Sequence, residues 1–197
     1  MAKGKFIDLP KPKTKGTVSV EETIAKRRSK RNYSSKALTN EQISQLLWSA
    51  QGITDERRGW RAAPSAGALY PLEVYLVKED GLYHYIPKGH KLELMKSEDL
   101  RPGLAKASWG QNFISQAPIS IVICAVYSRV TSKYGLRGNR YVEIEVGHAA
   151  ENIHLQATAL GLGSVPVGAY SDEAVSRLLE LPKNEEPLYI VPVGYVK

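Results

Sequence analysis

Alternating apolar and polar positions predict a pair of strands near the middle of the chain. LEVYLVK (72–78) and GLYHYIP (81–87) both alternate in this way around the turn sequence EDG, as in a β-hairpin. APISIVICAVY (117–127) is instead a continuous apolar, β-branched run, which is typical of a strand covered on both faces. PLYIVPVGYV (187–196) is expected to form the last strand.

Capping residues and apolar spacing mark the helices between these strands. Ser19, with Glu22 three residues later, has the pattern of a capping box, and that helix is expected to end near Ser29. Thr39 is expected to cap the next helix, which Gly52 ends. Helices are therefore predicted over residues 19–29, 39–52, 98–114 and 171–182.

The longest predicted helix is YVEIEVGHAAENIHLQATALG (141–161), preceded by a polar connection over residues 128–140. Its small residues let another helix approach closely, so it is expected in the centre of the core or at a subunit contact; they are Gly147, Ala149, Ala150, Ala157 and Ala159. The order of elements suggests an α+β sheet with helices packed against it. Residues 1–17, with Pro10 and Pro12, are interpreted as a basic extended arm or strand, and residues 18–197 as a single domain.

Composition and cysteine content limit the class of protein. The chain has 197 residues, of which 43% are hydrophobic and 24% charged, as expected of one folded domain. It has no apolar run long enough to span a membrane, and its start lacks the features of a secretory signal. Its one cysteine, Cys124, allows no internal disulfide and fits a reducing compartment. These features together predict a cytoplasmic protein.

Positive charge is concentrated at the N-terminal end. The net charge is +7, and residues 1–36 contain eleven Lys or Arg against three acidic residues. The stretch RRSKRNY (27–33) is the densest part, and it could face a nucleic acid, a membrane surface, a phosphorylated cofactor or water. A nucleic-acid site is not expected, because RNA-binding, zinc-finger and helix-turn-helix signatures are missing. The neighbouring stretch APSAGALYP favours a cofactor, since small residues let backbone approach a flat ligand closely.

Three other motifs have simpler interpretations than a functional site. The pairs Glu145/His148 and Glu151/His154 lie about 240° apart around one helix, so they cannot share a metal, and no metal site is expected. Cys124 is interpreted as a core residue with a raised pKa. GLGSVPVG leaves a helix, whereas a dinucleotide-binding glycine motif opens one, so its first glycines are interpreted as a helix end.

Three separated motifs, taken together, resemble the nitroreductase family of flavin enzymes. They are RRSKRNYS, PSAGALYPLEVYLV and KYGLRGNRYVEIEVGHAAENIHLQATALGLGSVPVGAY, and their likeness is greatest to the SagB-type dehydrogenase branch. The resemblance implies an α+β, nitroreductase-like fold with a mainly antiparallel sheet flanked by helices. It also implies a homodimer in which FMN lies at the subunit interface, with the long helix near that interface.

The resemblance assigns FMN-binding roles by position. Arg27, Arg28 and Ser29 resemble residues that hold the FMN phosphate and ribityl chain. Arg31 is expected to reach the pyrimidine edge of the ring, on the same side as Arg27 if the helical turn continues. The second motif, contributed by the partner subunit, comprises Pro64, Ser65, Ala66 and Gly67. The segment packed on one face of the ring comprises Val165, Pro166, Val167 and Gly168. A backbone N–H of Val167 or Gly168 is expected to face the hydride-accepting nitrogen, and either Lys197 or Arg140 completes the phosphate site.

Lys133 and Tyr134 match a Lys-Tyr pair of the azoline-oxidising members of this branch. There the pair helps remove a proton, and a Lys made less basic by burial suits that role. The alternative is a surface Lys beside a packing Tyr.

The resemblance thus implies an FMN-dependent oxidoreductase. Hydride would pass between FMN and a reduced nicotinamide, NAD(P)H, as the electron donor, and between FMN and an organic substrate such as a nitroaromatic, a quinone or an azoline-type heterocycle. The alternatives are a flavin-binding protein without turnover and a basic nucleic-acid-binding module.

Overall fold

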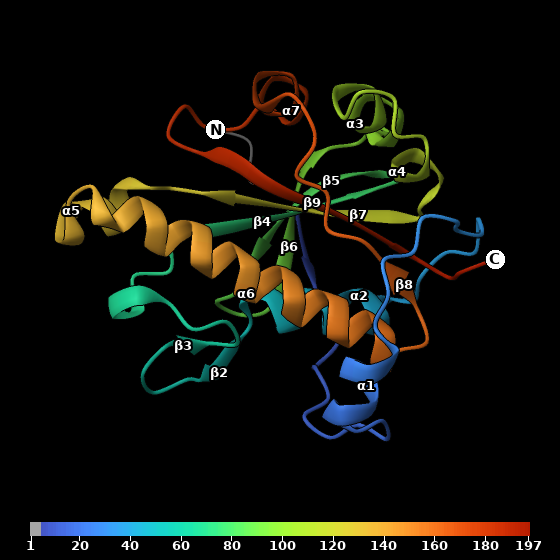
Figure 1. Ribbon diagram of the computed structural model, residues 1–197, viewed down its shortest axis with the longest axis horizontal. Helices are drawn as coiled ribbons and strands as arrows, with labels where there is room; N and C mark the ends of the chain where they lie inside the picture. The colour runs from blue at the N-terminus through green and yellow to red at the C-terminus, as the bar shows by residue number, and fades with distance from the viewer. Residues whose placement is uncertain (1–4) are drawn as a thin grey trace.

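A seven-stranded sheet forms the centre of the molecule in the computed structural model, which describes residues 5–197 (Figure 1). Its strand order is β1-β6-β5-β4-β7-β9-β8, and neighbouring strands are antiparallel. The strands are β1 (Lys5–Asp8), β4 (Leu72–Lys78), β5 (Gly81–Ile86), β6 (Lys91–Lys96), β7 (Ile119–Ala125), β8 (Gly163–Ser164) and β9 (Glu186–Gly194). A separate ribbon pairs β2 (Ile53–Asp55) with β3 (Trp60–Arg61).

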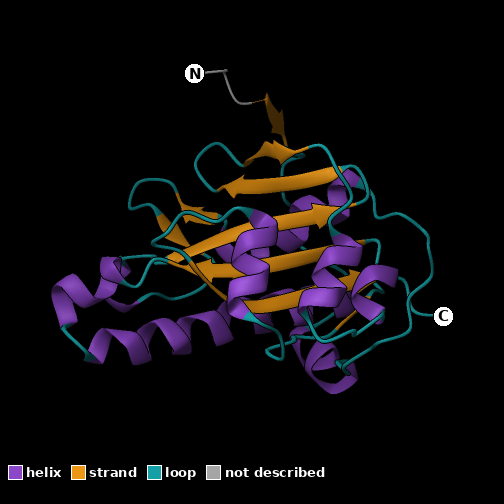
Figure 2. Ribbon diagram, turned by 90° about the horizontal axis from the view of Figure 1, so that it is seen from above, coloured by secondary structure: helices purple, strands orange, loops and turns teal. Residues whose placement is uncertain are grey.

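Helices cover both faces of this sheet (Figures 1 and 2). One face carries α1 (Val20–Lys26), α2 (Asn40–Gln51) and α6 (Arg137–Ala159), and the other carries α3 (Arg101–Ala107), α4 (Phe113–Gln116) and α7 (Asp172–Leu179). The mainly antiparallel α+β fold predicted from the sequence is confirmed.

Strand β7 shows why both faces are covered. Its seven residues are all buried. Ile121 and Ile123 join the core cluster that includes residues of α2 and α6, while Val122 and Cys124 join the cluster that includes residues of α3 and α7. Because strand side chains alternate between faces, a continuous apolar run is required here. Cys124 is a core residue as expected, and burial raises the pKa of its thiol.

Most predicted elements are confirmed. Ser19 accepts a hydrogen bond from the Glu22 N–H at the start of α1, and Thr39 forms a complete capping box at the start of α2. The β4–β5 hairpin, β9 and α7 lie where the sequence predicts them. Part of the basic arm is strand β1, which pairs with β6, a strand that we did not predict.

Three helix boundaries were wrong. The single helix expected over residues 98–114 is two helices, because Trp109 and Gly110 have positive φ angles of 55° and 78° and interrupt it. The polar connection expected over residues 128–140 is instead helix α5 (Ser128–Tyr134) followed by the first turn of α6. Helix α1 ends at Lys26, three residues before Ser29. None of the helices in residues 5–197 is long and apolar enough to cross a membrane.

Candidate functional site

The basic segment at residues 27–31, called here the cation segment, is extended rather than helical. Arg27 caps α1 with a ψ angle of 123°, and Ser29 then forms a parallel bridge with Ser164 of β8. The Lys30 N–H also donates to the Ser164 carbonyl, at 3.0 Å. The expectation that Arg27 and Arg31 share one helical side is therefore wrong, because the chain leaves the helix to pair with β8.

The segment expected to pack on a flavin ring, residues 165–168, follows β8 directly and so lies beside the cation segment in the same chain. The Val167 N–H donates to the Ile190 carbonyl at 2.8 Å, so it is already engaged. Within residues 5–197, the Gly168 N–H donates to no protein acceptor. Of the two backbone donors expected from the sequence, only Gly168 can serve a ligand.

The C-terminus reaches the same place. Tyr33 forms an antiparallel bridge with Val196, and the Lys197 N–H donates to the Asn32 carbonyl at 3.2 Å. Arg140 instead lies near the start of α6. Of the two residues expected to complete a phosphate site, Lys197 is the one that its own chain brings to the cation segment.

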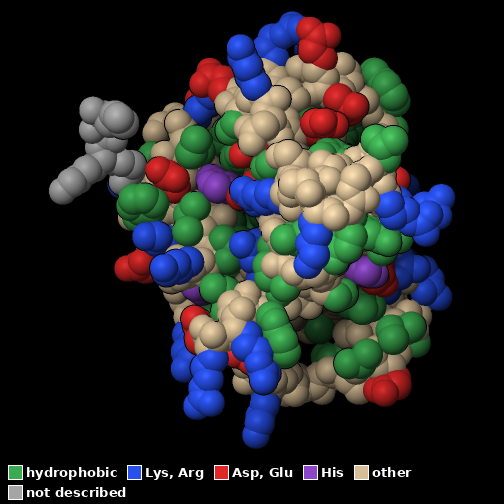
Figure 3. Space-filling model, turned by 90° about the vertical axis from the view of Figure 1, so that its left-hand side faces the viewer, with side chains coloured by type: hydrophobic (Ala, Val, Ile, Leu, Met, Phe, Trp, Pro, Cys, Tyr) green, Lys and Arg blue, Asp and Glu red, His purple; other side chains and the backbone are tan. Residues whose placement is uncertain are grey.

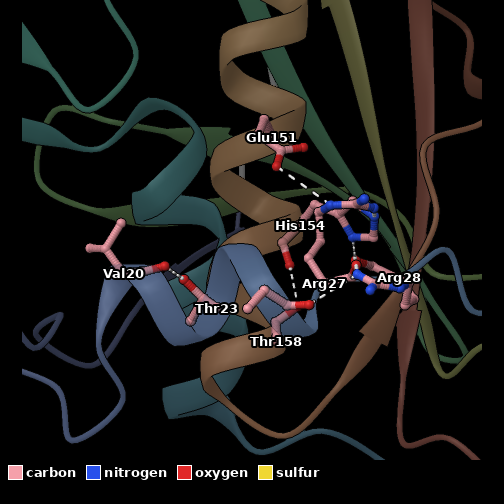
Figure 4. Close-up of polar contacts among 9 residues, drawn as sticks. Val20, Thr23, Arg27, Arg28, Glu151, His154 and Thr158 are labelled. Carbon is pink, nitrogen blue, oxygen red and sulfur yellow. Dashed lines mark hydrogen bonds and ion pairs between the residues drawn. The ribbon is translucent and has the colours of Figure 1, made fainter.

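Positive charge in the cation segment is only weakly compensated. The Arg27 Nε lies 3.8 Å from a Glu151 carboxylate oxygen (Figure 4). Within the described residues, Arg28, Lys30 and Arg31 form no ion pair, and the Arg31 guanidinium lies over the Phe113 ring. Excess positive charge beside available N–H groups suits an anion such as a phosphate.

The second motif, residues 64–67, is called here the small-residue loop. It leads into a single 3-10 turn, Ala66–Ala68, in which Gly67 has a positive φ of 63°. A Cβ added at Gly67 would lie 2.7 Å from the Tyr134 hydroxyl and 3.1 Å from the Lys133 ammonium. The loop and the Lys-Tyr pair, which are far apart in sequence, are therefore in contact.

Helix α5 holds Lys133 and Tyr134 in this position. A Cβ at Gly138 would lie 2.9 Å from the Thr131 backbone, so glycine there allows α5 to fold back closely onto α6. Arg129 of α5 bonds to Glu73 of β4 at 2.5 Å and anchors the helix on the sheet. Lys133 is exposed, so its own chain does not provide the burial expected from the sequence.

A buried carboxyl beneath the small-residue loop was missed as a candidate for function. Glu145 is 1% exposed, and its two oxygens have no hydrogen-bond partner within the described residues. It borders a cavity of about 280 Å³ with Pro64, Ser65 and His148. Burial raises the pKa of Glu145 to about 7, against the smaller opposing effects of Ser65 and Arg61. Sequence spacing placed Glu145 on a helix, but the cavity depends on the loop that folds over it.

Glu145→Gln is expected to stabilise the protein increasingly as the pH rises. A carboxyl whose pKa rises from 4.5 to about 7 on folding is ionised more readily in the unfolded chain, so wild-type stability falls as pH rises through that window. The free energy of unfolding of the variant should gain on wild type by up to about 3 kcal/mol between about pH 5 and pH 8. Urea unfolding at a series of pH values measures this. Glu143→Gln, at an exposed position of the same helix, is the matched control, and a constant difference for Glu145→Gln would contradict the prediction.

The predicted site residues form two groups at opposite ends of α6. The cation segment and Lys197 lie at its C-terminal end, near α1 and β8, and residues 165–168 lead from β8 along β9 toward α7 (Figure 1). The small-residue loop, Lys133, Tyr134 and Arg140 lie toward its N-terminal end, near α5. Because this helix has 23 residues, at about 1.5 Å per residue it spans roughly 35 Å. One chain therefore does not bring the two groups together.

Other surfaces do not coincide with these groups. A groove of about 720 Å³ lies between the basic arm, α2 and the C-terminal half of α6, and none of its lining residues is a predicted site residue. On the face that Figure 3 shows, Lys and Arg side chains are dispersed and alternate with acidic ones instead of forming one basic patch. Within residues 5–197 there is no cluster of three or more His, Cys, Asp or Glu side chains that could hold a metal ion.

Comparison with known proteins places the chain in a family. The model of the nitroreductase family matches residues 24–195. A Methanocaldococcus jannaschii protein that carries a nitroreductase name is 46% identical over 183 residues, covering 90% of this chain and 91% of that protein. The microcin B17-processing protein McbC of Escherichia coli is 28% identical, covering 72% of this chain and 56% of its own length.

Solved structures agree with the sequence relatives. A Ralstonia eutropha structure with a nitroreductase name superposes with a TM-score of 0.89 at 31% identity, covering 98% of this chain and 90% of that one. The Escherichia coli microcin synthetase McbBCD complex contains a chain with a TM-score of 0.76 at 25% identity, covering 96% of this chain and 77% of that chain. The resemblance inferred from the three motifs is confirmed, and the chain belongs to the nitroreductase family of oxidoreductases.

Proposed function

We propose that this protein is an FMN-dependent oxidoreductase whose site is assembled from two copies of the chain. The cation segment and residues 165–168 of one copy would face the small-residue loop and Lys133 of the other. The observation that supports this most directly is the position of the two groups at opposite ends of α6. A homodimer whose two-fold axis is perpendicular to α6 would make the two α6 helices antiparallel and bring their unlike ends together.

The residues present fit FMN. Arg27, Arg28 and Lys197 supply cations for a phosphate, and Ser29 supplies a hydroxyl. Of residues 165–168, Val165 and Val167 are buried in the core, whereas Pro166 and Gly168 reach the surface, where the Gly168 N–H is not bonded to protein. When bound, FMN would supply hydride transfer, while the protein would hold the cofactor and orient the substrate.

An exposed face of α6 and α1 supports association of two copies. Ile144 of α6 is 48% exposed, and a Cβ at the neighbouring Gly147 would meet no atom within 4 Å. On α1, Val20 and Ile24 are 64% and 58% exposed. These exposed side chains lie on two helices that contact each other, and exposed apolar surface of this kind can be buried when two copies associate.

The substrate class follows from the relatives and from the Lys-Tyr pair. FMN reductase [NAD(P)H] of Bacillus subtilis is 23% identical, covering 89% of this chain and 65% of its own length, and its name supports NAD(P)H as the electron donor. McbC, by its name, processes microcin B17, and this relative together with the Lys133-Tyr134 match supports our proposal of a SagB-type activity on azoline-type heterocycles. Nitroaromatics and quinones are the other proposed substrates. The cytoplasm is the proposed compartment.

Absorbance spectroscopy of the purified protein tests this function. A flavin enzyme is expected to absorb at about 450 nm and to lose this absorbance when NADH or NADPH is added anaerobically. A yellow protein that neither nicotinamide reduces would instead be a flavin-binding protein without turnover. A colourless protein that takes up no added FMN would contradict the proposal, and nucleic-acid affinity that falls steeply with salt would then favour the basic module.

Gly67→Val is expected to disrupt the half of the site formed by the small-residue loop. A β-branched residue is strongly disfavoured at a φ of 63°, and its Cβ would also displace Tyr134. The displaced loop and Tyr134 should weaken FMN binding roughly tenfold, as fluorescence titration would measure. Gly59→Val is the matched control, since Gly59 has a φ of 68° and open space around it. Equal FMN affinities for the two variants would contradict this prediction.

A further inference from the structure

Three side chains from distant parts of the chain make successive polar contacts at the cation segment, and Figure 4 labels two of them, Arg27 and His154. The Arg27 Nη1 lies 3.0 Å from the His154 Nε2, and the His154 Nδ1 lies 2.5 Å from the Ser164 hydroxyl. His154 and Ser164 are 2% and 1% exposed. The arginine side chain is 32% exposed, so the contact runs from the core to the surface.

The direction of these hydrogen bonds follows from the chemistry of the groups. A guanidinium has only donors, so the His154 Nε2 must accept from Arg27. The imidazole proton is then on Nδ1, which donates to the Ser164 hydroxyl. Arg27 therefore sets the tautomer, and Ser164 holds the orientation of the ring by accepting from the His154 Nδ1.

The acceptor for Arg27 is uncharged. Burial, and to a smaller degree Arg27 itself, lowers the pKa of His154 to about 4, so the ring is neutral near pH 7. A carboxylate in the same position would compensate the arginine charge, whereas a neutral ring orients the guanidinium and leaves its charge in place. Glu151, at 3.8 Å from the Arg27 Nε, is beyond hydrogen-bond distance and its side chain is 52% exposed.

Ser164 also fixes the backbone of the cation segment. Its carbonyl accepts from the Lys30 N–H at 3.0 Å while its hydroxyl contacts His154. Glycine precedes it, because a Cβ at Gly163 would lie 2.8 Å from the Lys30 Cβ. One buried serine thus connects the backbone of the segment with the side chain of its first arginine.

We propose that His154 and Ser164 are positioning residues that hold Arg27 for the phosphate monoester of a bound ligand. This inference rests on the proposed function, in which that ligand is FMN. Arg27 uses one of its five N–H donors to keep its orientation and presents the others, with a full positive charge, to the phosphate. Neither positioning residue needs to touch the ligand.

Titration of the flavin-free dimer with FMN and with riboflavin, which lacks the phosphate, tests this. His154→Leu is expected to weaken FMN binding about tenfold and to change riboflavin binding by less than about twofold. His154→Gln, whose amide oxygen can accept from Arg27, should restore most of the FMN affinity. Ser164→Ala nearly keeps the core volume but removes the acceptor for the His154 Nδ1 proton, and should weaken FMN binding about threefold, again without affecting riboflavin. Thr158→Ala is the control, because Thr158 bonds to the His154 carbonyl and not to the ring.

The outcomes separate this inference from the proposed function. An FMN affinity unchanged in both His154→Leu and Ser164→Ala, or equal losses for FMN and riboflavin, would overturn the positioning role while FMN binding by wild type stands. A wild-type protein that binds neither flavin would overturn the proposed function and the inference with it. Because Ser164→Ala removes only one oxygen, it remains informative if His154→Leu does not fold.

Discussion

Arg27→Ala is expected to raise the dissociation constant for FMN roughly 10- to 100-fold. A hydrogen bond to a charged group contributes about 1.5–3 kcal/mol, and Arg27 is the member of the cation segment whose side chain the core fixes. Retention of FMN during extensive dialysis, measured by absorbance, and fluorescence titration of the stripped protein both report the change.

The effect should depend on the position of the charge and not on net charge alone. Arg177→Ala removes the same charge from an exposed site on α7, where Arg177 pairs with Glu173, and should leave FMN affinity unchanged. If both variants lose FMN equally, general electrostatic attraction rather than a fixed contact holds the phosphate, and the assignment of Arg27 is wrong.

Lys133→Ala is expected to leave FMN bound while slowing proton-coupled oxidation by about a hundredfold or more. Dehydrogenation of an azoline-type ring removes a hydride and a proton, and the proton needs a base beside the ring. Lys133 lies against the small-residue loop at Gly67, where it could act on a substrate held over a flavin from the partner copy. Turnover of a thiazoline model compound under single-turnover conditions measures this step.

Reduction by NADH supplies the internal comparison for Lys133. Accepting a hydride from a nicotinamide needs no base for a substrate proton, so its rate should be nearly unchanged in Lys133→Ala. Lys183→Ala, at an exposed position before β9, is the matched control. Equal oxidation rates for Lys133→Ala and wild type would contradict the catalytic role. Lys133 would then be a surface lysine beside a packing tyrosine, the alternative interpretation.

Local patterns predicted the central elements well because packing agrees with them. The apolar run at residues 117–127 became β7, buried on both faces, and the period of residues 141–161 became most of α6. In both cases the same residues favour the local conformation and also pack in the core. The cap residues Ser19 and Thr39 were also predicted correctly, because their hydrogen bonds are local and are made within three residues.

Elements that depend on distant contacts were not predictable in this way. Helix α1 ends early because Ser29 and Lys30 pair with Ser164, more than 130 residues later. Helix α5 reads as a polar connection, since its one buried residue is Val130 and its position is fixed by Arg129 and Gly138.

In the candidate site too, local motifs could be predicted from the sequence and contacts between distant residues could not. Its motifs were visible in the sequence, but their separation into two groups along α6 was not. Glu145 and His154 were first considered as parts of two Glu-x-x-His pairs. Their roles follow instead from what covers each of them, a loop in one case and Arg27 with Ser164 in the other.

Mixing two defective subunits tests most directly whether each site is built from two chains. Arg27→Ala and Gly67→Val are each expected to lose FMN as homodimers. In a mixed dimer, one site would combine the intact cation segment of one chain with the intact small-residue loop of the other. After co-refolding with differently sized tags, random pairing should restore FMN to about a quarter of all sites, as absorbance at about 450 nm would show. Formation of mixed dimers without any recovery of bound FMN would contradict the two-chain site.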